Sequence, residues 1–200
     1  MDKKEHKRNV SIITISGYSG SGKSTLAKNL AEALPDTIFL RSDVIRKQIF
    51  GVPETEKLPP EAYKVEIHIL VREEMQRLTK EALENGKNVI IDAALIDEEA
   101  RKSQEDYAEK LGVSFVGIWV DVKPETLFER VEARKNDASD AGVDVVKKQL
   151  TYNHGKNNWA KLDGHKSPEN VLEQALKVLK SNGSKKNFKH HPPSGTNDRP

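Results

Sequence analysis

The feature that most constrains this chain is the segment Gly17–Ser24, G-Y-S-G-S-G-K-S, which has the form G-x-x-x-x-G-K-[ST]. An apolar, β-branched run over residues 10–16 precedes it and predicts a buried strand. Leu26, Leu30 and Leu34 follow at helical spacing, so a helix should begin where the loop ends. Strand, glycine loop and helix form the context in which this motif cradles phosphate. The start of the chain therefore predicts a phosphate-binding loop.

Each residue type in this loop has a physical role in holding a polyphosphate. Glycine permits positive φ angles, so successive N–H groups can point at an anion beside the positive end of the following helix. Lys23 can reach the β- and γ-phosphates, and the Ser24 hydroxyl can ligate Mg²⁺. A glycine-rich turn without a ligand is the alternative, and the flanking strand and helix disfavour it. The loop residues predicted to bind a nucleoside triphosphate are Gly17, Ser19, Gly20, Ser21, Gly22, Lys23, Ser24 and Thr25.

Composition excludes several other classes of protein. The chain has 200 residues, 32% of them charged and 36% hydrophobic. No apolar run approaches the ~18 residues of a membrane span. The absence of cysteine excludes disulfides, zinc–thiolate sites and cysteine nucleophiles. Because the charged start of the chain is also unlike a signal peptide, we expect a cytoplasmic protein without a membrane partner.

Charge is distributed unevenly along the chain. The formal net charge is +2, but residues 1–10 and 181–200 are both basic, and the segment between them is mildly acidic. A broad nucleic-acid footprint should be basic. Nucleic acid is therefore a less favoured partner than a small molecule, although a small basic cleft is compatible with this charge distribution.

The apolar pattern divides the chain into a polar N-terminal extension (1–8), an α/β domain (9–180) and a polar tail (181–200) that we expect to be disordered. Five strands are predicted at residues 10–16, 37–40, 88–94, 113–121 and 157–163. Helices are predicted from the loop to residue 34 and at residues 44–50, 61–85, 97–111, 124–134, 145–153 and 168–180. This alternation predicts three layers, with helices on both faces of a parallel sheet that binds ligands at the carboxyl ends of its strands.

Three aspartates fall at or near the predicted carboxyl ends of strands. Asp92 follows the third strand and is predicted to bind Mg²⁺ or its water, with a cap or turn as the alternative. Asp43 follows the second strand and is predicted to orient or deprotonate an acceptor hydroxyl, with helix capping as the alternative. Arg46 lies three residues later on the same helical face, so both side chains can point at one acceptor. Asp121 fits a turn better than catalysis.

Two arginines precede a polar stretch, residues 135–142, that we interpret as a mobile flap over the triphosphate. We predict that Arg130 helps to bind the nucleotide and that Arg134 stabilises the transferred group, as an arginine finger does. Surface arginines paired with nearby glutamates are the alternative. Ser139 or Asp140 is expected to cap the helix after the flap.

Four segments carry a resemblance to known proteins: Gly17–Thr25, Leu40–Lys47 (L-R-S-D-V-I-R-K), Val89–Ala93 (V-I-I-D-A) and Arg134–Ala141 (R-K-N-D-A-S-D-A). They resemble the bacterial P-loop kinase-like proteins that are often labelled AAA-family ATPases. They are also similar to the 5′-kinase domain of polynucleotide kinases and, more distantly, to gluconate and chloramphenicol kinases. The resemblance covers about residues 9–180.

The resemblance implies a P-loop NTPase fold with a five-stranded parallel sheet of order 2-3-1-4-5, a helical acceptor side and a small arginine lid. In the polynucleotide-kinase pattern, the residue matching Asp43 acts as base toward the acceptor hydroxyl. The residue matching Arg46 helps to hold the acceptor, and the one matching Arg134 comes from the lid. The mildly acidic middle of this chain departs from that pattern and disfavours a nucleic-acid acceptor.

These residues predict an ATP- and Mg²⁺-dependent kinase that transfers the γ-phosphoryl group to a hydroxyl of a small metabolite. Two alternatives stay open: a polynucleotide 5′-hydroxyl kinase, and an ATP-binding switch or interaction module without a phosphate acceptor. The chain has no N-K-x-D sequence for reading guanine, which favours ATP over GTP. We expect acceptor specificity to lie in residues 51–74, and the sequence determines neither the acceptor nor the oligomeric state.

Overall fold

The structure is a computed structural model that describes residues 10–134 and 138–185. Its strands form one sheet in the order β2-β3-β1-β4-β5, and every neighbouring pair is parallel. The strands are β1 (Ser11–Ser16), β2 (Thr37–Arg41), β3 (Asn88–Asp92), β4 (Ser114–Asp121) and β5 (Ala160–Asp163). This order and direction confirm the predicted fold class. The expected N-terminal extension lies outside the described residues.

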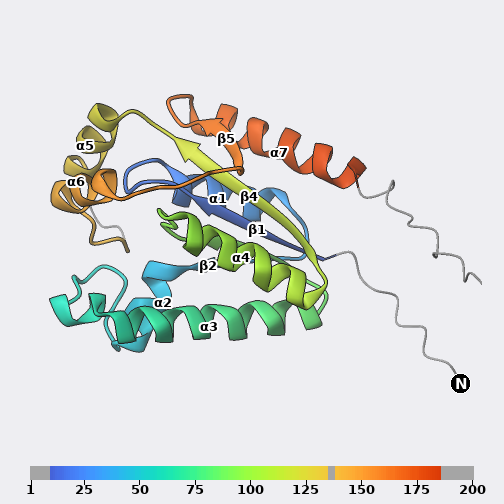
Figure 1. Ribbon diagram of the computed structural model, residues 1–200, viewed down its shortest axis with the longest axis horizontal. Coiled ribbons are helices and arrows are strands. Elements are labelled where there is room, and N and C mark those ends of the chain that lie inside the picture. Colours follow the sequence, from blue (N-terminus) through green and yellow to red (C-terminus); the bar gives the residue numbers. More distant parts are fainter. Residues whose placement is uncertain (1–9, 135–137, 186–200) are drawn as a thin grey trace, which may run out of the picture.

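Helices cover both faces of the sheet, with α7 on one side and α3 on the other (Figure 1). The α-helices are α1 (Lys23–Ala33), α2 (Ser42–Ile49), α3 (Val65–Glu84), α4 (Glu98–Leu111), α5 (Pro124–Glu132), α6 (Val143–Thr151) and α7 (Pro168–Lys185). In the described part of the chain, none of these helices is long and apolar enough to cross a membrane.

The two faces of β1 belong to two separate apolar layers. Ile12 packs with residues of α3 and α4, whereas Ile13 and Ile15 pack with Leu26 and Leu30 of α1. All five side chains are buried. Each such side chain contributes roughly 1.5–3 kcal/mol relative to an exposed one, so these layers hold the sheet in place.

The carboxyl ends of the first three strands meet at one edge. Asp92 of β3 pairs in register with Ile15 of β1 on one side and with Arg41 of β2 on the other. The loop after β1 and the start of α2 therefore lie beside Asp92. The sheet topology thus brings together segments far apart in sequence.

The helix expected from residue 61 begins later. Residues Pro60–Tyr63 form a short 3-10 helix, η1, and Lys64 is extended before α3 starts at Val65. Arg46 Nη1 donates a hydrogen bond to the Ala62 carbonyl, which holds η1 against α2. The extended Lys64 provides the carbonyl that accepts the first N–H groups of α3. This break gives η1 a direction of its own and places Tyr63 in the wall of the cavity described below.

Two boundaries near the C-terminus also differ from expectation. β5 begins at Ala160 rather than near residue 157, because the Asn157 side chain accepts the Trp159 N–H and forms a turn there. Helix α7 continues beyond residue 180 to Lys185, so the start of the expected disordered tail is helical. The Ser181 hydroxyl and the Asn182 amide both donate to the Val178 carbonyl, which supports this last turn. The rest of the expected tail lies outside the described residues.

Candidate active site

The glycine loop connects β1 to α1, and within it the Ser21 N–H donates to the Tyr18 carbonyl and the Ser19 N–H to the Gln149 side chain. α1 begins at Lys23 with Gly22 as N-cap, and no side chain caps the helix. The first-turn N–H groups therefore have no side-chain acceptor from the cap position. Gly20 has φ 86°, and a Cβ here would lie 2.8 Å from the Leu127 carbonyl oxygen of α5. Only glycine fits, so packing against α5 fixes the shape of the loop.

The other residues predicted to contact nucleotide lie in the loop and in the first turn of α1, and their contacts stay predictions. Ser19 and Ser21 are buried in the loop, while Ser24 and the exposed Thr25 lie in the first turn of α1. Gly17 has φ 148°, and a Cβ there would lie 2.7 Å from the Val120 carbonyl oxygen of β4. The loop is therefore wedged between β4 and α5.

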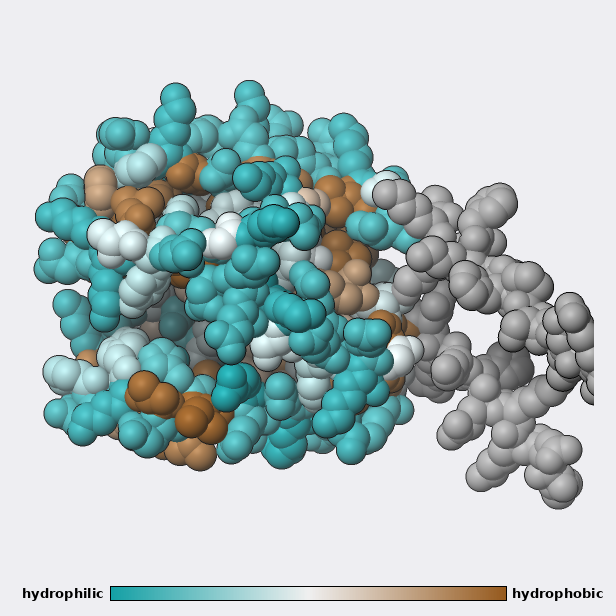
Figure 2. Space-filling model, viewed as in Figure 1, coloured by the Kyte–Doolittle hydropathy of each residue, from teal (hydrophilic) through white to brown (hydrophobic). Residues whose placement is uncertain are grey.

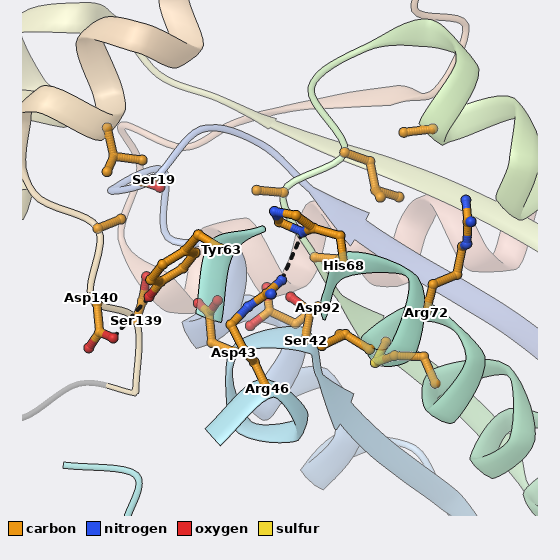
Figure 3. A pocket seen from close by; sticks show the side chains of 18 of the residues that line it. Ser19, Ser42, Asp43, Arg46, Tyr63, His68, Arg72, Asp92, Ser139 and Asp140 are labelled. Carbon is orange, nitrogen blue, oxygen red and sulfur yellow. Dashed lines mark hydrogen bonds between the residues drawn. The ribbon is translucent and has the colours of Figure 1, made fainter. Parts of the chain in front are cut away.

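A cavity of about 660 Å³ lies between this loop and the helices on the α2 side of the sheet. The molecular surface is hollowed on the face shown in Figure 2. Lys23 of the loop, Asp43 and Arg46 of α2, and Asp92 of β3 all line this cavity. The structure thus brings together four residues that the sequence predicted separately as catalytic, substrate-binding and metal-binding. Asp43, Arg46 and Asp92 are labelled in Figure 3.

Asp92 has the features of a metal ligand. It is 4% exposed, its Oδ2 accepts a hydrogen bond from Arg41 Nε at 3.2 Å, and its Oδ1 has no hydrogen-bond partner in the described chain. Burial raises the pKa of Asp92, and the Lys23 charge, the Ser24 hydroxyl and the Arg41 charge counteract that shift. The described residues contain no cluster of three or more potential metal-ligating side chains. Mg²⁺ commonly needs only one or two protein ligands beside phosphates and waters, so Ser24 and Asp92 fit this role.

Asp43 lies in the first turn of α2 and faces the cavity (Figure 3). Arg41 occupies the N-cap position, and no side-chain hydrogen bond caps the helix there. The alternative interpretation, in which Asp43 caps α2, is therefore unsupported. The position of Asp43 is consistent with the predicted role toward an acceptor hydroxyl, which stays a prediction.

Arg46 lies on the same face of α2 and is 6% exposed. Its Nη1 donates to the Ala62 carbonyl at 2.7 Å, and its Nη2 lies 3.0 Å from His68 Nδ1. The guanidinium also lies over the Tyr63 ring, 5.3 Å from its centroid. Burial lowers the pKa of Arg46, and the Asp43 charge opposes this shift. These contacts fix the guanidinium in the wall of the cavity, and its role toward an acceptor stays a prediction.

A buried lysine beside the cavity was missed by the sequence reasoning. The side chain of Lys47 is 1% exposed, and its Nζ donates to the carbonyls of Glu54 at 2.7 Å and Glu56 at 2.5 Å. The same Nζ forms a salt bridge of 3.2 Å with Asp140 Oδ1. We call this cluster the Lys47 latch: it consists of Lys47 and Asp140 with their partners Glu54, Glu56, Leu58 and Tyr63. It joins α2 to the loop after α2 and to the segment before α6.

The second oxygen of Asp140 completes this latch. Asp140 Oδ2 accepts hydrogen bonds from the Leu58 N–H and the Tyr63 hydroxyl, both at 2.9 Å. The prediction that Ser139 or Asp140 caps α6 is wrong, since Gly142 occupies the N-cap position without a side-chain cap. Lys47, Leu58 and Tyr63 instead engage both carboxylate oxygens of Asp140.

The two predicted lid arginines do not line the described cavity. Arg130 donates to the carbonyls of Gly20 at 3.5 Å, Ser21 at 3.3 Å and Gly164 at 2.9 Å. It therefore braces the phosphate loop from the α5 side, and its contact with nucleotide stays a prediction. Arg134 lies half-buried just after α5, and its role in transfer also stays a prediction. Residues 135–137 of the expected flap lie outside the described residues.

The fold and the site define a class of protein. A glycine loop between β1 and α1, on a parallel sheet of order 2-3-1-4-5, presents a lysine to the same cavity as two aspartates. This arrangement is that of a P-loop kinase, a class that uses ATP and Mg²⁺. Residues 12–153 match the family described as AAA domain, and the chain belongs to this family.

Three proteins similar to this chain are kinases that are named for different acceptors. A thymidylate kinase of Leptospira borgpetersenii serovar Hardjo-bovis is 23% identical, over 88% of this chain and 96% of its own length. A shikimate kinase of Lactococcus lactis is 27% identical, over 82% of this chain and 95% of its own. A gluconokinase structure from Sinorhizobium meliloti has a TM-score of 0.60 at 20% identity, covering 93% of this chain and 100% of that one. The comparisons establish the kinase family and the shared fold, and leave the acceptor open.

Proposed function

We propose that this protein transfers the γ-phosphoryl group of MgATP to a hydroxyl of a small molecule. The observation that carries this proposal is the single cavity lined by both Lys23 and Asp43. Lys23 would hold the β- and γ-phosphates at the loop, while Asp43 would meet the acceptor. The cavity, about 660 Å³, falls within the range typical of small-molecule sites.

In the proposed transfer, the site residues bind the phosphates and take up the proton of the acceptor. The acceptor oxygen attacks the γ-phosphorus, the bond from that phosphorus to the β–γ bridging oxygen breaks, and ADP leaves. The hydroxyl proton passes to the Asp43 carboxylate. The loop N–H groups and Lys23 stabilise the charge on the phosphates, and bound Mg²⁺, held through Ser24 and Asp92, would neutralise part of it.

The Asp43 carboxylate favours a hydroxyl over a phosphate as the reacting group of the acceptor. In the proposed reaction Asp43 faces the reacting group of the acceptor, and its negative charge would repel a phosphate there. A carboxylate can instead accept the proton of a hydroxyl. The mildly acidic middle of the chain likewise supports a small acceptor over a polynucleotide.

The test is the variant Asp43→Asn, assayed for ADP release with a panel of sugars, nucleosides, hydroxy acids and a 5′-hydroxyl oligonucleotide. We expect ATP affinity to stay within about threefold of wild type and turnover to fall about 10²–10⁴-fold. Asp106→Asn is the control, because Asp106 is an exposed residue of α4 that does not line the cavity. Full turnover by Asp43→Asn would exclude Asp43 as the base. Preferred use of the oligonucleotide, with steep weakening by salt, would replace the small acceptor with a polynucleotide.

A further inference from the structure

A glutamine of α6 contacts the phosphate loop directly. Gln149 is 9% exposed, and its Oε1 accepts a hydrogen bond of 2.9 Å from the Ser19 N–H. Val146, three residues earlier, is fully buried in the apolar core. Packing of Val146 fixes the rotation of α6, so Gln149 is held facing the loop. Gln149 and Ser19 also line the cavity that contains Lys23 and Asp43.

This contact determines which way the glutamine amide points. An N–H can donate only to the carbonyl end of the amide, so Oε1 must face Ser19 and the Nε2 group must point away from it. In the described chain, Nε2 donates no hydrogen bond. It is also absent from the buried polar atoms that lack a partner among the described residues, so protein atoms do not fully enclose it. Because Gln149 lines the cavity, these two N–H groups of a neutral side chain can donate to a group bound beside the loop.

We propose that the Nε2 group of Gln149 donates a hydrogen bond to the phosphoryl group during transfer. This inference rests on the phosphoryl transfer proposed above. In that transition state the charge spreads over three equatorial oxygens of the transferred group. Lys23 and bound Mg²⁺ would stabilise the charge of this group from the loop side, and Gln149 adds a hydrogen-bond donor from α6. Because Ser19 already orients the amide, the donor needs little reorganisation when the charge develops.

A purely structural role for Gln149 depends on a different atom of its side chain. A brace for the loop needs only the oxygen that accepts the Ser19 N–H, and a glutamate provides such an oxygen together with a negative charge that repels phosphate. A donor to the phosphoryl group needs the nitrogen, which glutamate lacks. Leucine, of similar size, removes both groups. The variants Gln149→Glu and Gln149→Leu therefore separate the two roles.

The experiment uses the full chain and two probes, MgADP alone and MgADP with aluminium fluoride, which mimics the transferring group. We expect Gln149→Glu to keep the melting temperature, while its added charge weakens binding of both complexes, so the ratio of the two affinities is the quantity compared. Its affinity for the fluoroaluminate complex should fall about 100-fold more than its affinity for MgADP, as for the loss of one preorganised donor. Gln149→Leu should show a similar loss for the fluoroaluminate complex together with a lower melting temperature. Lys148→Gln, an exposed neighbour outside the cavity lining, should leave both affinities unchanged.

Two results would overturn the inference. One is wild-type affinity of Gln149→Glu for the fluoroaluminate complex, and the other is equal weakening of both complexes. Either would leave Gln149 as a brace for the loop or a general influence on nucleotide binding. Failure of the acceptor panel with normal fluoroaluminate binding would instead count against the proposed hydroxyl acceptor and not against Gln149.

Discussion

Replacing Lys47 by methionine tests how much the Lys47 latch stabilises the fold. Methionine keeps most of the length and volume of the side chain but removes the ammonium. The substitution deletes the hydrogen bonds to the Glu54 and Glu56 carbonyls and the 3.2 Å salt bridge to Asp140. Because Lys47 is 1% exposed, water cannot readily take the place of the ammonium.

The magnitude follows from what each partner keeps. Removing one member of a fully buried ion pair destabilises a protein by about 3–5 kcal/mol, since the other charge is left uncompensated. Asp140 keeps its hydrogen bonds from the Leu58 N–H and the Tyr63 hydroxyl, and its side chain is 11% exposed. Leaving its charge without the lysine therefore costs less than for a fully buried carboxylate. Loss of the desolvation penalty of the ammonium also offsets part of the cost. We therefore expect Lys47→Met to lower the free energy of unfolding by about 2–3 kcal/mol.

Chemical denaturation of wild type and Lys47→Met measures this loss directly. For a chain of this size, 1 kcal/mol shifts the melting temperature by about 2–4 °C, so a fall of about 5–10 °C should accompany it. Lys80→Met is the control, because Lys80 pairs with Glu84 on the exposed face of α3. A loss below about 0.5 kcal/mol in Lys47→Met would show that the buried ammonium contributes nothing net, and the latch argument would fail.

The remaining predictions concern the loop and the pH dependence of the latch. Lys23→Ala should abolish measurable turnover or weaken ATP binding strongly while the fold persists, and unchanged kinetics would contradict the loop assignment. Burial raises the pKa of Asp140, but its hydrogen bonds with Leu58, Tyr63 and Lys47 outweigh burial and leave that pKa below its usual value. The stability from this carboxylate is present above the unfolded pKa of about 3.9 and is lost as pH falls from there through the lower folded pKa. The stability gap between wild type and Asp140→Asn should therefore be flat from about pH 7 to 5 and shrink toward pH 3, and a constant gap would refute this assignment.

The fold could be read from the sequence because its signals are local. The apolar run before Gly17 and the helical spacing after Lys23 each depend on a few neighbouring residues. Asp43, Asp92 and Lys23 could be placed in one site because the carboxyl ends of parallel strands share one edge. The start of α3 was predicted too early, since the break at Lys64 depends on η1 packing against α2 rather than on local spacing.

The contacts around the site could not be predicted in the same way. Ser19 and Gln149 are 130 residues apart, and Tyr63 and Asp140 are 77 apart. No periodicity links such pairs, and Gln149 and Lys47 look like ordinary polar positions of amphipathic helices. Asp140 even matched a capping position, and only the tertiary structure shows that its carboxylate binds elsewhere.

Asp43 and Lys47 lie one turn apart on α2, so one short rigid helix both presents the proposed base and anchors the segment before α6. A ligand or substitution that displaces the anchored segment therefore also changes the alignment of the base. The ammonium that forms this anchor is shielded from amine-directed reagents while the segment stays in place. The Lys47 ammonium should therefore become reactive only when the segment before α6 moves, and that movement would also displace Asp43 from its alignment with the acceptor.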